Sequence, residues 1–106
     1  MGTTLIPRAK TTEEYVAMIE QAIDDAWDLR QSIEYDEDYM ADARGFIDQL
    51  ENSLKQLYQS MKEGEYKFAT GDLPFMEIVS KYHDAHIPFK FLLKRINETH
   101  LKGLDV

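Results

Sequence analysis

The chain has 106 residues, of which 43% are apolar and 30% are charged, and its net charge at pH 7 is −8. This length fits one domain, and the composition is that of a folded soluble protein rather than a disordered chain. Because cysteine is absent, disulfides, thiolate metal ligands and a thiol nucleophile are excluded. No apolar run approaches the roughly 20 residues of a membrane span or forms a secretory signal, so we expect a cytoplasmic protein.

The charge is unevenly distributed along the sequence. Residues 11–40 contain ten acidic residues and one basic residue, whereas residues 66–106 contain five acidic and six basic residues. The overall acidity disfavours nucleic acid and anionic membranes as partners, because both carry negative charge. The acidic segment is typical of a solvated helix face, and it also suits contact with a basic partner or with the chain's own C-terminal segment.

The first helix is expected over residues 12–34. Residues 1–10 show no periodic pattern and predict a flexible N-terminal arm, ahead of a single helical domain at residues 11–106. Thr11 and Glu14 have the spacing of a capping box. Apolar residues then recur at spacings of three and four, namely Tyr15, Ile19, Ala22, Ala26, Leu29 and Ile33, with Met18, Ile23 and Trp27 widening the stripe.

A second helix is expected over residues 37–62, ended by Gly64. Its apolar stripe has the same spacing and consists of Met40, Ala43, Ile47, Leu50, Leu54, Leu57 and Met61. We expect the backbone to reverse at residues 35–38, so that the two stripes face each other in an antiparallel hairpin. The alternative is one unbroken helix of about 50 residues, since no glycine or proline lies between Thr11 and Arg44.

Two shorter helices are expected over residues 73–85 and 88–102. Asp72 and Pro74 have the positions of a helix cap and a first-turn proline, and Pro88 separates the two helices. The predicted fold class is therefore all-α: a long antiparallel helical hairpin followed by two short helices, in a helical-bundle-like arrangement.

The two long stripes predict self-association, and we expect a homodimer in which hairpin packs on hairpin. The sequence contains no phosphate loop, serine elbow or other catalytic motif. We therefore interpret it as a non-enzymatic protein-interaction or regulatory and assembly module. Its expected contact surface combines the basic last helix with the acidic first helix and consists of Lys90, Phe91, Lys94, Arg95, Glu20, Asp24 and Asp28.

The alternative function is a metal- or cofactor-binding helical bundle. His83 and His86 are three residues apart, and Glu77 lies about two turns upstream, so these side chains are candidate ligands of one metal ion. No third ligand stands at a defined spacing, and the pair equally fits a polar helix end before Pro88. We therefore expect no cofactor, and we expect His100 to be a packing residue on the apolar side of the last helix.

Overall fold

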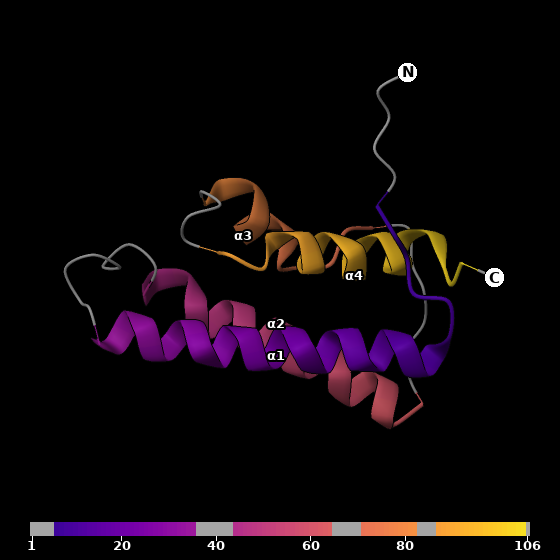
Figure 1. Ribbon diagram of the computed structural model, residues 1–106, viewed down its shortest axis with the longest axis horizontal. Helices are drawn as coiled ribbons and strands as arrows, with labels where there is room; N and C mark the ends of the chain where they lie inside the picture. Colours follow the sequence, from indigo (N-terminus) through magenta and orange to yellow (C-terminus); the bar gives the residue numbers. More distant parts are fainter. Residues whose placement is uncertain (1–5, 36–43, 65–70, 83–86, 106) are drawn as a thin grey trace, which may run out of the picture.

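The computed structural model describes residues 6–35, 44–64, 71–82 and 87–105. Their regular structure consists of helices and no strands: α1 (Thr12–Tyr35), α2 (Arg44–Lys62), α3 (Met76–Lys81) and α4 (Lys90–Lys102). Helices α1 and α2 lie side by side in one layer, and α3 and α4 form a second layer against them (Figure 1). The all-α class expected from the sequence is confirmed. None of the described helices has the length and apolarity needed to cross a membrane.

Helices α1 and α2 run antiparallel. Toward one end of the pair, Arg30 of α1 forms ion pairs with Asp48 and Glu51 of α2. Toward the other end, the Tyr58 hydroxyl of α2 donates a hydrogen bond to Glu20 Oε2 of α1 at 2.9 Å. Residue numbers therefore fall along one helix as they rise along the other.

Tyr35, the first residue of the expected chain reversal at residues 35–38, is still helical in α1. Residues 36–38 fall outside the described residues, which resume at Arg44. The expected first turns of the second helix fall outside them as well. That helix ends at Lys62, as predicted. Gly64 follows with a φ of +74°, a left-handed conformation that glycine adopts without strain and that commonly ends helices.

The core lies between the layers and contains most of the two predicted stripes. Its stripe residues are Tyr15, Ile19, Ala22, Ala26, Leu29 and Ile33 of α1 and Ile47, Leu50, Leu54 and Leu57 of α2. Helix α4 contributes the buried Leu93 and Ile96, and the buried Tyr15 hydroxyl donates to the Ile96 carbonyl at 3.0 Å. Because the chain covers these stripes itself, burying them requires no second hairpin.

Helix α3 is shorter than the helix expected over residues 73–85. It spans Met76–Lys81, and the backbone is extended directly after it. Asp72 does not cap it, because Asp72 Oδ1 accepts a hydrogen bond from Asn97 Nδ2 of α4 at 3.1 Å. The Leu73 N–H donates to Asn97 Oδ1 at 2.8 Å. The buried asparagine therefore holds this segment against α4, and a turn precedes α3.

The described part of the expected flexible arm, residues 6–10, lies against α4. Ala9 is buried, and its N–H donates to Thr99 Oγ1 at 3.0 Å. Its carbonyl accepts a hydrogen bond from the Asp105 N–H at 2.8 Å. These bonds join the segment before α1 to the residues at the end of α4 and after it.

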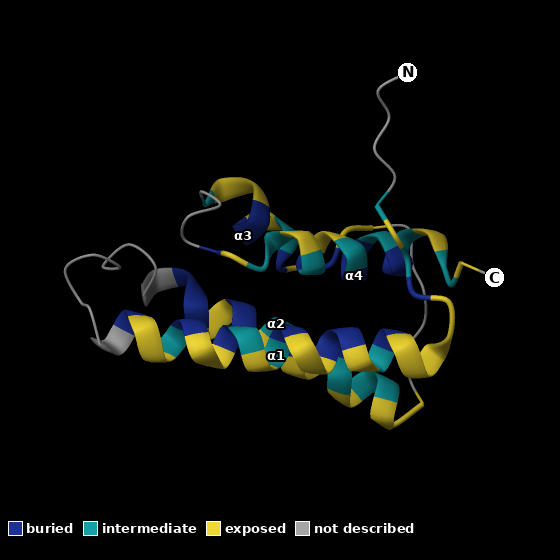
Figure 2. Ribbon diagram, viewed as in Figure 1, coloured by how far each residue is buried: buried dark blue, intermediate teal, exposed yellow. Residues whose placement is uncertain are grey.

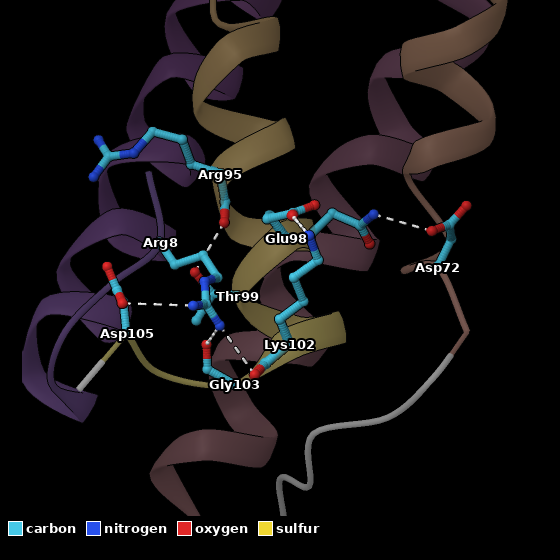
Figure 3. Close-up of polar contacts among 9 residues, drawn as sticks. Arg8, Asp72, Arg95, Glu98, Thr99, Lys102, Gly103 and Asp105 are labelled. Atoms are coloured by element: carbon cyan, nitrogen blue, oxygen red, sulfur yellow. Dashed lines mark hydrogen bonds and ion pairs between the residues drawn. The ribbon is translucent and has the colours of Figure 1, made fainter. Parts of the chain in front are cut away.

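Arg8 covers the C-terminal end of α4, as Figure 3 shows. One of its guanidinium nitrogens donates to the carbonyls of Lys102 and Gly103 at 3.1 and 3.2 Å, and the other lies 3.5 Å from Asp105 Oδ1. The last carbonyls of a helix lack helical partners and form the negative end of the helix dipole. A guanidinium at this position therefore stabilises the end of α4.

Candidate functional site

Two large apolar side chains are exposed among the described residues. Trp27 of α1 is 55% exposed and Phe91 of α4 is 53% exposed, and both helices show exposed stretches alternating with covered ones (Figure 2). The expectation that Trp27 widens the buried stripe of α1 is wrong. Ala26 is fully buried and points into the core. Because successive helix residues are rotated by about 100° around the axis, Trp27 then points away from the core.

Phe91 lies in a basic setting on the outer face of α4. Lys94 and Arg95 follow it by three and four residues, a spacing that places all three on one face of the helix. Lys94 is exposed, and Arg95 is half-buried, with its Nε donating to the Pro7 carbonyl at 3.1 Å. We call Phe91, Lys94 and Arg95 the basic patch.

The other charged residues of α4 are engaged within the chain. Lys90 Nζ donates to the Tyr82 carbonyl, which ties the start of α4 to the segment after α3. Glu98 and Lys102 form an ion pair one turn beyond the basic patch (Figure 3). Lys94 is therefore the most suitable position for changing the charge of the surface without disturbing the fold.

Trp27 lies in an acidic setting on the outer face of α1. Asp24 precedes it by three residues and Asp28 follows it directly, and both aspartates are exposed. We call Asp24, Trp27 and Asp28 the acidic patch. Glu20, one turn before Asp24, accepts a hydrogen bond from the Tyr58 hydroxyl, so this third predicted acid also holds α1 to α2.

An open groove continues the acidic patch between α1 and the turn before α4. Its volume is about 340 Å³, and it is lined by Asp25, Asp28, Leu29, Ser32, Pro88 and Phe89. Asp25 is half-buried and accepts a hydrogen bond from Gln21 Nε2 at 2.9 Å. Carboxylates beside apolar residues suit a lysine or arginine side chain, whose stem is aliphatic and whose end is charged.

The metal hypothesis rests on residues that lie mostly beyond the described part of the chain. His83 and His86 fall in residues 83–86, which the structure does not describe. Glu77 is exposed on α3, and its carbonyl accepts a hydrogen bond from Ser80 Oγ at 3.0 Å. Within the described ranges, no three histidine, aspartate or glutamate side chains gather as metal ligands would. The metal site stays a prediction of the sequence.

His100 is buried on the inner side of α4, as expected of a packing residue. Burial lowers the pKa of His100, because it disfavours the charged imidazolium. A hydrogen bond to the backbone of Gly71 and the negative charge of Asp72 oppose this shift without cancelling it. The side chain therefore serves the packing between α4 and the segment before α3.

Comparisons with known proteins add no assignment to this geometry. No family model matches the chain, and neither a curated protein nor a solved structure is significantly similar to it. An all-α fold by itself supports many functions, so function has to be argued from the two patches. Sequence reasoning identified their charged residues and Phe91, but it placed Trp27 in the core.

Proposed function

We propose that the protein is a non-enzymatic protein-interaction module, acting in regulation or assembly, and that it binds partners through the basic patch. The observation that carries the proposal is the exposure of Phe91 on the same helix face as the cations Lys94 and Arg95. The opposite face of α4 is packed through Leu93 and Ile96, so the fold does not require an aromatic residue at position 91.

The chemistry of the basic patch favours a protein partner. Exposed aromatic residues and arginine are enriched at protein interfaces, because they combine a large contact area with directed polar contacts. Lys94 and Arg95 favour an acidic surface on the partner. The net charge of −8 repels such a surface only over a short range, since physiological salt screens charges beyond about 8 Å.

The proposal can be tested by placing a photo-crosslinking amino acid, such as benzoylphenylalanine, at position 91 in the native host. The control places the same amino acid at Lys55, an exposed residue of α2 outside both patches. We expect a defined covalent adduct from position 91 and none from position 55. Lys94→Glu, added to the position-91 protein, should abolish the adduct.

Three results would contradict the proposal. They are no adduct at position 91, the same adducts from both positions, or an adduct that Lys94→Glu leaves unchanged. Because Lys94 is exposed, we expect the Lys94→Glu variant to fold like the wild type. A far-ultraviolet circular dichroism spectrum and a melting curve that match those of the wild type will verify this. Mass spectrometry of the adduct then identifies what the basic patch contacts.

A further inference from the structure

We infer that the acidic patch binds the basic patch of a second copy of this chain. The inference rests on the proposed function for the basic patch and names its partner. The two patches have related geometry and opposite charge. Each places one exposed aromatic residue and two charged residues within five consecutive positions of one helix face, Asp24, Trp27 and Asp28 on α1 and Phe91, Lys94 and Arg95 on α4.

Within the described part of one chain, the charged residues of the two patches are not paired with each other. Helices α1 and α4 pack on each other through their inner faces, where the Tyr15 hydroxyl reaches the Ile96 carbonyl. Trp27 and Phe91 are both exposed, and among the described residues no ion pair joins Asp24 or Asp28 to Lys94 or Arg95. The complementary charges are therefore left available to pair between copies.

The contacts available to two copies explain why each patch contains an aromatic residue. Trp27 presents an indole face, the best aromatic partner for a cation, and arginine is the cation that most often stacks on it. Phe91 and Trp27 each have about half of their surface left to bury. The groove beside Asp28 is large enough to receive the end of a basic side chain.

The contact joins two different surfaces, so it is heterologous. In a pair joined by one such contact, one chain keeps its basic patch unoccupied and the other keeps its acidic patch unoccupied. Both patches of both chains are occupied only if the two chains are related by a twofold axis and form the contact twice. The patches are small compared with the interfaces of permanent complexes. We therefore expect a reversible association, visible at tens to hundreds of micromolar protein, rather than a permanent dimer.

The experiment uses sedimentation velocity at concentrations from 5 to 500 µM, a range chosen around a dissociation constant of roughly 100 µM, in physiological salt. One variant disables the acidic patch (Asp24→Lys with Asp28→Lys), and the other disables the basic patch (Phe91→Ser with Lys94→Glu). Lys55→Glu serves as a charge control outside both patches. Each patch variant alone should remain monomeric, while the wild type and the control associate.

Mixing the two patch variants is the decisive arm. Each variant keeps the patch that the other has lost, so an equimolar mixture should form one native contact and stop at two chains. The wild type should also associate at least tenfold more weakly in 1 M salt, because the Debye length falls to about 3 Å. A monomeric wild type, self-association by either patch variant, or a mixture that stays monomeric would overturn the inference.

Fluorescence gives a second readout that does not depend on the charge variants. Trp27 is the only tryptophan of the chain and is exposed in the single copy, so its emission should shift to shorter wavelength as the wild type associates. Association without this shift would mean that another surface is responsible, which also overturns the inference.

Failure of this inference can be separated from failure of the proposed function. If the position-91 crosslink captures a different protein while the wild type stays monomeric, the interaction module stands and its partner is not a second copy. If no adduct forms and no self-association is seen, both proposals fail.

Discussion

Removal of the positive charge of Arg30 is expected to destabilise the fold through the carboxylate that it leaves behind. Arg30 of α1 pairs with two acids of α2, and hydrogen bonds to Asp48 and then Glu51 raise the pKa of its guanidinium. The exposed fraction of the side chain is 74% for Asp48 and 7% for Glu51. In Arg30→Met, Asp48 remains hydrated, whereas Glu51 stays buried without its cation.

The size of the effect follows from what a buried carboxylate costs. Breaking a fully buried ion pair by removing one partner costs about 3–5 kcal/mol. The Arg30 side chain is 30% exposed, so solvent reduces the loss. We expect the free energy of unfolding to fall by about 2 kcal/mol at pH 7.

Urea unfolding followed by circular dichroism at pH 7 measures this loss. Adding Glu51→Gln to Arg30→Met should recover more than half of the loss at pH 7. Asp48→Asn should cost under about 0.5 kcal/mol, as for other exposed pairs. A loss that Glu51→Gln leaves unchanged, or that equals the Asp48→Asn effect, would refute the reasoning.

Three further predictions concern the end of α4 and its packing. Burial lowers the pKa of His100, so the unfolded chain binds more protons than the folded one as the pH falls below about 6.5, and the protein loses stability. His100→Gln should reduce this loss of stability between pH 7 and 5.5, as measured by urea unfolding. Unfolding curves with the same pH dependence in the variant and the wild type would contradict this. Arg8→Met removes two hydrogen bonds from the guanidinium to the carbonyls at the end of α4, and thermal unfolding should show a loss of about 1 kcal/mol. Arg8→Lys keeps a cation and should lose less. Equal losses in the two variants would mean that the aliphatic part of the Arg8 side chain, and not its charge, stabilises this end. Gly103→Ala should cost about 1 kcal/mol because the φ of Gly103 is +83°, whereas Gly71→Ala has space and no positive φ and should be neutral.

The helices were predictable because they depend on close neighbours in the sequence. The three-and-four spacing of the stripes identified α1 and α2 and most of the buried residues on them. Thr11 Oγ1 accepts a hydrogen bond from the Glu14 N–H at 3.0 Å, as its capping position predicted. Helix α4 ends at Lys102, as expected, and Gly103 with its φ of +83° directly follows it.

The errors concern residues whose role depends on distant parts of the chain. Asp72 has the local sequence of a helix cap, but Asn97, 25 residues later, provides its hydrogen-bond partner. Residues 6–10 have no local pattern, yet Ala9 bonds to Thr99, 90 residues away. Trp27 is large and apolar, and only the packing of α1 shows that the smaller Ala26 occupies the core beside it.

The candidate site follows the same division. The charges of Lys94, Arg95, Asp24 and Asp28 and their helical spacing can be read from the sequence, because a helix places residues three and four apart on one face. Whether the aromatic residue beside each pair is buried or exposed depends on which faces the other helices cover.

By itself, the sequence determined where the described helices form and which of their faces are apolar, because backbone hydrogen bonds and side-chain periodicity within a helix involve residues about four positions apart. Only the tertiary structure decided that the stripes are covered within one chain, that the segment before α1 joins the end of α4, and that Trp27 and Phe91 remain exposed. These features depend on how four helices share one core, and local sequence patterns do not contain that information.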